Sequence, residues 1–371
     1  MENEQIKVVS RERLYSLDAL RGFDMFWITG GGSLIAALAK YTGAGWLRTV
    51  ANQMEHAAWV GFNFQDLIFP LFMFISGVAI PFSVIAKIEK NFPKAELAKK
   101  AVKRGLTLVL LGFIYNGVLG DGFRNPRFAS VLGLIGLAYL FASLIIIYSR
   151  SFKSWLVWLC GILVGYGVLQ LLVPVPGVGA GVLTPEGSIN TYIDQMFLPG
   201  HFFGDIYDPE GILCVVSAIG IILMGAIAGT VLRDKNRQDN QKLKMLLIIG
   251  TSSIISSLIL STFYPIIKQC WTSTFNLAAG GIGFALLAVF YWIIDVRGWK
   301  KWSFFFRVIG MNSIFIYMLD EVANVGAITK EFWGWTVLLG DFGPIIMISG
   351  RIMMVWLLLY YMYKRNILLR V

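Results

Sequence analysis

The feature that most constrains this chain is a series of apolar runs, each close to the length of a membrane-spanning helix. A bilayer core needs about 20 apolar residues in helical form, and only helices and closed barrels satisfy the backbone in lipid. Each run is too long and too uniformly apolar for a barrel strand. We predict an all-α, polytopic integral membrane helix bundle, a single domain over residues 1–371 with a core at 13–365. The ten predicted spans are 17–38, 64–86, 104–119, 128–148, 154–173, 211–232, 243–263, 274–294, 303–322 and 342–363.

The distribution of positive charge predicts which side of the membrane each loop occupies. The formal net charge is +10 and only 15% of the residues are charged, against about 25% in soluble proteins. Of the lysines and arginines, 25 fall on the side of the termini, six fall on the opposite side, and Arg351 lies inside the last span. This asymmetry is a strong positive-inside signal. Both termini are therefore expected in the cytoplasm, and the basic charge indicates contact with anionic membrane lipid rather than nucleic acid.

His56 is one of only two histidines, and both it and His201 fall on the far side. Histidine can take up and release a proton near neutral pH. One interpretation makes His56 an acid–base group at the mouth of the second span. The other makes it an ordinary interfacial histidine or a helix cap. The sequence alone leaves both open.

Asp66 follows ten residues later, at the start of the same span. A continuous helix would hold the two residues about 15 Å apart, so they meet only if residues 56–63 fold back as a loop. A carboxylate in the apolar zone costs about 2.5–3.5 kcal/mol. Such a cost is typical of a functional group, and a structural salt bridge is the alternative.

Two further polar groups lie within predicted spans. Asp18, Arg21 and Asp24 share one helical face, either as a self-neutralising cluster or with Arg21 facing a cavity and holding an anionic ligand. Asn312 and Ser313 fall near the middle of the ninth span. They either bond neighbouring helices or line a cavity.

The far-side segments 39–63 and 174–210 are long for connecting loops, and such loops are often functional. At the end of the second, Asp208 suits an N-cap, Pro209 the first helical position and Glu210 the positive helix end. The alternative places both acids at the rim of a site for a cationic or hydroxylated substrate.

Five stretches, in order along the chain, resemble the heparan-α-glucosaminide N-acetyltransferase family of transmembrane acyltransferases and its bacterial relatives. They run from about residue 13 to the C-terminus. They are "RLYSLDALRGFDMFWI", "HAAWVGFNFQDLIFPLFMFISGVAI", "YDPEGILCVVSAI" with "LMGAIAG", "PIIKQCWTSTF" and "IGMNSIFIYM".

The resemblance implies transfer of an acetyl group from cytoplasmic acetyl-CoA to an amino sugar or other glycan acceptor on the far side of a bacterial inner membrane. A homodimer is also expected from it. The family histidine falls on His56 and the acid of its DL-[IV]-FP motif on Asp66. His56 would be the general base or would carry the acetyl group, and Asp66 would orient it.

The remaining site residues are expected along the path of the donor. CoA is a polyanion, and the basic inner rim offers Arg21, Lys103, Arg104 and Arg307 for its phosphates. Asn312 and Ser313 are expected to contact the reacting groups or the acyl arm. The substrate-binding residues expected at the far side are Trp59, Asp208, Glu210 and Trp271, the last packing against a sugar face.

Two rival functions are a secondary transporter of a small polar solute and a non-catalytic membrane subunit. Transporters often contain internal repeats, and no convincing repeat is visible here. The three cysteines, Cys160, Cys214 and Cys270, are scattered and indicate neither a disulfide framework nor a metal site. Consumption of acetyl-CoA would separate the acyltransferase from both rivals.

Overall fold

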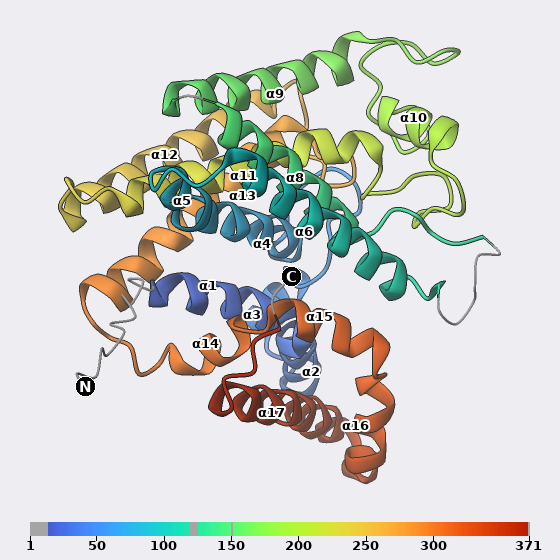
Figure 1. Ribbon diagram of the computed structural model, residues 1–371. Helices are drawn as coiled ribbons and strands as arrows, with labels where there is room; N and C mark the ends of the chain where they lie inside the picture. Colours follow the sequence, from blue (N-terminus) through green and yellow to red (C-terminus); the bar gives the residue numbers. More distant parts are fainter. Residues whose placement is uncertain (1–13, 119–124, 150, 370–371) are drawn as a thin grey trace, which may run out of the picture.

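The computed structural model describes residues 14–118, 125–149 and 151–369, and these residues form helices joined by loops, with no strand beyond isolated bridges. Figure 1 shows the long helices arranged in one bundle. The elements of the first half are α1 (Tyr15–Phe26), η1 (Trp27–Gly31), α2 (Gly32–Thr42), α3 (Gly45–Asn52), α4 (Phe64–Ile80), η2 (Pro81–Ile85), α5 (Ala86–Ile88), α6 (Lys94–Tyr115), α8 (Val131–Tyr148) and α9 (Phe152–Leu172). Those of the second half are α10 (Ile189–Phe197), α11 (Ile212–Arg233), α12 (Asp239–Leu260), α13 (Ser273–Phe290), η3 (Tyr291–Val296), α14 (Phe304–Gly310), α15 (Ser313–Val322), α16 (Val325–Trp333), η4 (Gly334–Phe342) and α17 (Gly343–Lys364).

The prediction of a polytopic helical membrane protein is confirmed. Within the described residues, eight helical segments are long and apolar enough to cross a bilayer. They coincide with eight of the ten predicted spans. The matching segments are Tyr15–Thr42, Phe64–Ile88, Val131–Tyr148, Phe152–Leu172, Ile212–Arg233, Asp239–Leu260, Ser273–Val296 and Val325–Lys364, the last of which contains α17.

The other two predicted spans, 104–119 and 303–322, are helical but are not among the eight segments long and apolar enough to cross a bilayer. The total of ten spans therefore stays a prediction. The run at 104–119 lies in α6, whose first half is rich in lysine and leaves only eleven apolar-rich residues after Arg104. The run at 303–322 is divided into the short helices α14 and α15, because the backbone of Asn312 leaves the helical region with φ −129° and ψ 40°.

The first span is also bent. Gly30 lies inside it with φ 140° and ψ 0°, in the region that favours glycine. The bend separates α1 from α2 and brings Gly30 against Ile352 of α17, where an added Cβ would lie 3.3 Å from the isoleucine side chain. The glycine therefore permits both the kink and the close packing of the first and last spans.

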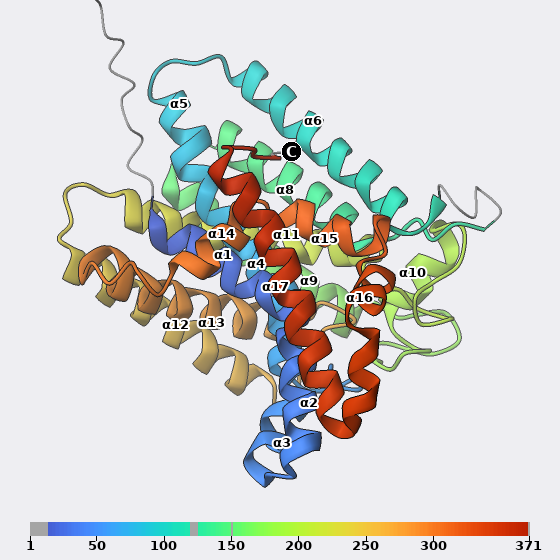
Figure 2. The same ribbon diagram turned by 90° about the horizontal axis from the view of Figure 1, so that it is seen from below.

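Two apolar clusters form the interior. The larger one is built mainly from α4, α8, α11 and α13, and the smaller one from α14, α15, α16 and α17 with Met25 of α1. In Figure 2 the red helices α16 and α17 lie across the bundle, beside α2 and α15. The cavities described below lie where walls from the two clusters meet.

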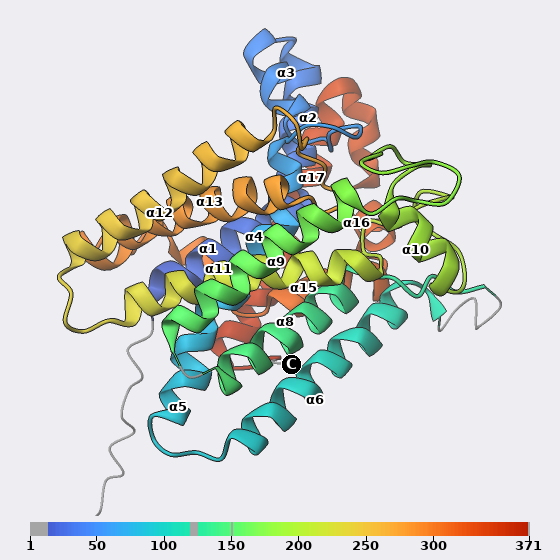
Figure 3. The same ribbon diagram turned by 90° about the horizontal axis from the view of Figure 1, so that it is seen from above.

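Contacts between loops group them at two ends of the bundle, seen at opposite ends of the long helices in Figure 3. At one end Arg233 Nη1 lies 2.8 Å from Glu89 Oε1, and Tyr291 donates a 2.6 Å hydrogen bond to Asp239. At the other end the indole of Trp59 donates a 2.7 Å hydrogen bond to the Leu183 carbonyl. These pairings agree with the sides assigned from the charge distribution.

Candidate active site

His56 and Asp66 lie in direct contact, as the loop interpretation required. The imidazole Nδ1 of His56 is 2.7 Å from Oδ1 of Asp66, and the second carboxylate oxygen accepts backbone hydrogen bonds from Ala57 (3.1 Å) and Asn63 (3.0 Å). Asp66 side-chain atoms are fully buried, whereas 52% of the His56 side chain is exposed. Because the ionised carboxylate accepts only, we assign the Nδ1–H tautomer to His56, which leaves the lone pair of Nε2 available.

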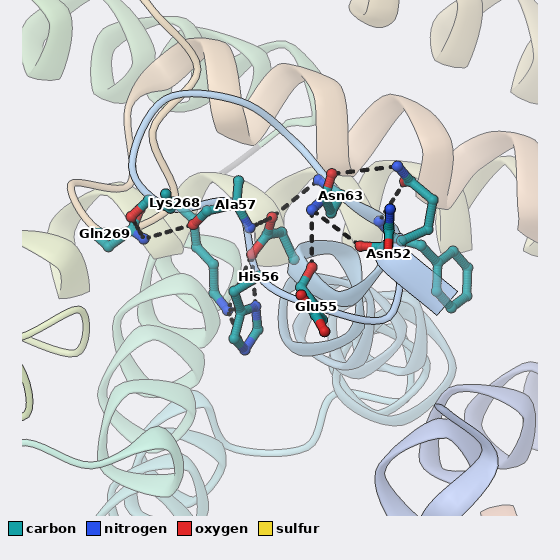
Figure 4. A network of polar contacts seen from close by, with 11 residues as sticks. Asn52, Glu55, His56, Ala57, Asn63, Lys268 and Gln269 are labelled. Carbon is teal, nitrogen blue, oxygen red and sulfur yellow. Dashed lines mark hydrogen bonds and ion pairs between the residues drawn. The ribbon is translucent and has the colours of Figure 1, made fainter. Parts of the chain in front are cut away.

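The contact arises from the way α4 begins. Asn63 is the N-cap and Asp66 the third helical residue, and their side chains and backbones form a capping box. The preceding loop turns back over this helix end, and Asn63 Nδ2 donates to the Glu55 carbonyl at 3.0 Å. Figure 4 shows His56 and Ala57 carried by this loop above α4. Asp66 therefore caps a helix and orients His56 at the same time.

A third group, Lys268, completes the cluster. Its ammonium nitrogen lies 3.0 Å from Nδ1 and 3.3 Å from Nε2 of His56, and 3.5 Å from Oδ1 of Asp66. Only 14% of the Lys268 side chain is exposed. Burial lowers the pKa of Lys268, while the carboxylates of Asp66 and Glu210 act in the opposite direction. Figure 4 shows Lys268 reaching His56 from the neighbouring loop.

The loops that carry His56 and Lys268 are joined through their backbones. Gly61 N–H donates to the Ile266 carbonyl at 2.9 Å, Val60 forms an antiparallel bridge with Ile267, and Gln269 Nε2 donates to the Ala57 carbonyl at 3.3 Å. These contacts hold two segments about 200 residues apart in the chain in one register.

A cavity of about 630 Å³ opens from this cluster into the bundle. Its outer end carries His56, Lys268, Gln269, Arg127 and Glu210 together with the aromatic rings of Phe203 and Tyr207. Its inner part is apolar and ends at Phe72, Ser313 and Ile314. Apolar walls with a few convergent polar groups are typical of small-molecule sites.

A second cavity of about 210 Å³ continues toward the opposite end. Phe72, Ser313 and Ile314 line both cavities. The second cavity also has Asp18, Arg21 and Arg104 in its wall. The two cavities are therefore neighbours with three wall side chains in common, and they have basic groups in one and His56 in the other.

The two arginines of the inner cavity are held differently. Arg21 lies 3.5 Å from Asp18, one helical turn earlier. The guanidinium of Arg104 lies over the ring of Tyr139 at 4.2 Å, and its buried Nε has no hydrogen-bond partner among the described residues. Asp24, the third member of the predicted face, is fully buried and lines neither cavity.

The prediction that Asp208 caps α11 is wrong, because the N-cap of this helix is Gly211. The helix starts at Ile212 after Gly211, and the carboxylate that accepts its first N–H is Asp194, at 2.8 Å. Asp208 instead accepts two hydrogen bonds from Arg127, at 2.7 Å to Nε and 2.6 Å to Nη2. Arg127 lies between the predicted spans 104–119 and 128–148, and nothing in the sequence indicates this pairing.

Glu210 shares the same arginine, since its Oε2 contacts Nη2 of Arg127. Burial raises the pKa of Glu210 to about 7, although the charge of Arg127 opposes this shift. Burial alone would lower the pKa of Arg127, but hydrogen bonds and charges from Asp208 and Glu210 raise it above its ordinary value. Glu210 lines the outer cavity, and Asp208 lies behind it as the partner of Arg127.

The two tryptophans predicted to contact substrate lie outside the cavity wall. Trp271 is 0% exposed, packs against Phe69 and Phe275, and donates to the Pro209 carbonyl at 2.9 Å. A sugar cannot reach this indole, so its expected stacking role is corrected to core packing. Trp59 packs edge-on against Tyr207, a cavity residue, with ring centroids 4.9 Å apart.

Asn312 and Arg307 also differ from their expected cofactor contacts. Asn312 is buried, and its side chain donates to the Ile367 carbonyl at 3.2 Å and accepts from Leu369 N–H at 2.9 Å. It therefore holds the C-terminal segment, whose Leu368 and Leu369 side chains line the inner cavity. Arg307 lies over the ring of Tyr15 at 4.1 Å and lines neither cavity. Ser313, by contrast, lines both cavities as the cavity interpretation expected.

Comparison with curated proteins supports the resemblance found in the motifs. Human heparan-alpha-glucosaminide N-acetyltransferase is 29% identical over 369 residues, covering 84% of this chain and 53% of the human protein. The mouse protein of the same name is 27% identical over 371 residues, covering 84% of this chain and 54% of the mouse protein. No family model matches the chain. The chain is thus homologous to these two acetyltransferases and spans about half of their length.

Proposed function

We propose that the chain is an integral membrane acyltransferase that moves an acetyl group from acetyl-CoA to an amino sugar or other glycan acceptor. The observation that supports this most is the pair of neighbouring cavities with three shared wall residues, which would together form a passage. The passage would join a basic inner end to a histidine–carboxylate pair at the outer end. The relatives are named as acetyltransferases, which favours this function over a transporter.

Arg21 and Arg104 are the groups that would hold the phosphates of the donor at the inner end. The unpartnered buried Nε of Arg104 fits an anionic ligand, because a buried donor left without a partner is costly. The acyl arm would then pass Phe72, Ser313 and Ile314 toward His56. A donor at the inner end and an acceptor at the outer end correspond to the cytoplasmic and extracytoplasmic faces of a bacterial inner membrane.

His56 supplies the acid–base chemistry of this proposal. As the acceptor nitrogen attacks the thioester carbon, Nε2 takes up the proton that the nitrogen loses. The new C–N bond replaces the C–S bond. CoA leaves as the thiolate, while the proton stays on Nε2 of His56. Asp66 keeps Nδ1 in its hydrogen bond and stabilises the ring while it carries the positive charge.

A route through an acetyl group carried by His56 uses the same geometry. In that route Nε2 attacks the thioester, the thiolate leaves, and the acceptor then displaces the imidazole. Release of CoA before acceptor is added distinguishes this route from direct transfer. In either route the acceptor would face two aromatic rings and one carboxylate of the outer cavity, those of Phe203, Tyr207 and Glu210.

The test uses the full chain in proteoliposomes, with labelled acetyl-CoA on one side and an amino sugar on the other. The wild type should acetylate the sugar across the membrane, and His56→Ala should abolish transfer. His201→Ala is the matched control, since His201 is exposed and bonded to the Asn125 carbonyl at 2.7 Å. Uptake of unmodified sugar without consumption of acetyl-CoA would instead establish a transporter.

A further inference from the structure

The position of Lys268 beside both ring nitrogens of His56 is not explained by the roles of His56 and Asp66 alone. An ammonium group 3.0 Å from Nδ1 and 3.3 Å from Nε2 is within contact distance of any proton that the ring takes up. Nδ1–H donates to Asp66, so the ammonium lies close to both nitrogens of a ring whose Nε2 is unprotonated. The charge of the lysine therefore acts on the same ring nitrogen that the proposed transfer uses.

We propose that Lys268 is a positioning residue that keeps His56 neutral between turnovers, so that Nε2 is available to accept the proton of the acceptor. This inference rests on the proposed function. A second positive charge on the imidazole would lie next to the ammonium, and like charges at this separation disfavour each other strongly. The lysine side chain is only 14% exposed, although 52% of the His56 side chain is exposed, so water screens this repulsion only in part.

Two carboxylates, those of Asp66 and Glu210, lie around Lys268 and His56. Both favour the charged form of Lys268. Asp66 lies 3.5 Å from the ammonium and raises its pKa, as does Glu210, against the lowering caused by burial. The Asp66 carboxylate and the Lys268 ammonium both lie within hydrogen-bonding distance of the imidazole, so the ring faces one charge of each sign. The charge of Glu210 is already shared with Arg127.

The backbone next to Lys268 is held in place by buried hydrogen bonds, as expected for a segment that positions a functional side chain. Two residues later, the Cys270 carbonyl accepts hydrogen bonds from Tyr166 (3.0 Å), Gln170 (2.9 Å) and Asn190 (3.4 Å), all from buried side chains. Trp271 has φ 47°, a conformation that is unusual for a bulky residue. Such conformations persist only where the surroundings impose them, and they concentrate at functional sites.

The chain itself makes this inference measurable, because it contains only two histidines. In a full-length sample labelled with ¹⁵N-histidine, the ring signals of His56 and His201 can be followed over pH, and His201→Asn assigns them. The measured quantity is the pH midpoint of the His56 signal, which needs neither donor nor acceptor. It therefore reports on the ring whether or not the protein is an acetyltransferase.

Replacing Lys268 with methionine removes the charge and keeps most of the side-chain volume. The midpoint of His56 should then rise by about one pH unit or more, and the acid limb of the activity profile should move to higher pH by the same amount. Lys268→Arg should restore the wild-type midpoint. Lys268→Gln serves as a second neutral variant if the methionine variant does not fold.

Lys40→Met is the matched control, because it removes the charge of a lysine whose side chain is 78% exposed and does not line the cavity. It should leave the His56 midpoint unchanged. A midpoint that stays constant or falls in both neutral variants would overturn the inference, as would a shift in Lys268→Arg equal to that in Lys268→Met. Failure of the wild type to transfer acetyl groups would instead overturn the proposed function, whatever the midpoints.

Discussion

Nδ1 of His56 lies 2.7 Å from Oδ1 of Asp66, although the two residues belong to a loop and to the helix that follows it. The carboxylate is held from the other side by two backbone N–H groups, so its orientation is independent of the histidine. A base positioned by a fixed carboxylate is the arrangement found in many acyl-transfer sites. The relationship supports a specific role for each residue.

Replacing Asp66 with asparagine should leave the fold intact and lower the rate of acetyl transfer. The amide can present its own N–H to Nδ1 and so favours the wrong tautomer of His56. The expected loss in kcat is about 10²- to 10⁴-fold, measured with labelled acetyl-CoA. Asp205→Asn is the matched control, because Asp205 is exposed and does not line the cavity. Equal activity of Asp66→Asn and wild type would remove Asp66 from the mechanism.

The proximity of these two residues could be predicted only in part. The sequence points to Asp66 because a carboxylate at the start of an apolar run is costly, and to His56 because the chain has only two histidines. Their contact depends on the path of residues 56–63, which no periodicity specifies. The sequence shows that a loop at 56–63 is needed for the two side chains to meet. It does not show that the chain forms that loop.

The contacts of Lys268 and Arg127 could not be predicted from the sequence. Both lie in loops outside the predicted spans, where the cost of burying a charge in lipid gives no signal. Lys268 is 212 residues from His56, and Arg127 is 81 residues from Asp208. Such pairs are created by tertiary packing, so only the structure could bring them together.

The predicted helices were recovered where a span is uniformly apolar, as in α11 and α13. They failed to form one continuous helix at 303–322, where Asn312 supplies side-chain bonds to the C-terminal segment in place of helical backbone geometry. Asn312 was correctly singled out as a polar group at depth. Its partner could not be predicted, because the last residues of the chain carry no pattern that places them.

Arg104 should contribute to donor affinity more than to the rate of chemistry. Its guanidinium is in the wall of the inner cavity and its Nε lacks a partner among the described residues. Arg104→Gln should raise KM for acetyl-CoA about tenfold or more, since a charge-assisted hydrogen bond contributes about 1.5–3 kcal/mol. Arg307→Gln is the control, because Arg307 lines neither cavity. Equal effects of the two variants would exclude a specific donor contact at Arg104.

Phe72 should limit the size of the transferred acyl group. Its side chain lies in the wall that the two cavities share, on the proposed path of the acyl arm. Phe72→Ala should widen this point and increase the ratio of butyryl to acetyl transfer, because a longer chain no longer meets the ring. Phe69→Ala removes a ring that lines only the outer cavity and serves as the comparison. An unchanged ratio in Phe72→Ala would mean that the acyl arm takes another path.

The two ends of the passage should lie on opposite sides of the membrane. Glu55 and Lys90 are exposed and lie beside His56 and in the basic loop before α6, respectively. In a Cys160→Ser background, cysteines at these positions should react with a membrane-impermeant maleimide from opposite sides of sealed vesicles. The other native cysteines, Cys214 and Cys270, are buried. Reaction of both introduced cysteines from the same side would contradict transfer across the bilayer.

Asp194 should make the stability of the protein depend on pH. Burial raises its pKa from 3.8 to about 7, helped by the charge of Asp208 and opposed by the hydrogen bond from Ile212 N–H. The folded state therefore binds this proton more tightly than the unfolded state, and the resulting stabilisation is present below about pH 4 and is lost as the pH rises toward 7. Asp194→Asn keeps an oxygen acceptor for Ile212 and cannot ionise.

The thermal midpoint of Asp194→Asn in detergent should thus match that of the wild type near pH 4 and exceed it at pH 8. The expected gain at pH 8 is about 1–3 kcal/mol in free energy of unfolding. Asp205→Asn removes an exposed acid and should change neither value. A lower midpoint for Asp194→Asn at pH 8 would contradict this prediction, and would show that the bond of the ionised carboxylate to the start of α11 stabilises the fold more than its burial destabilises it.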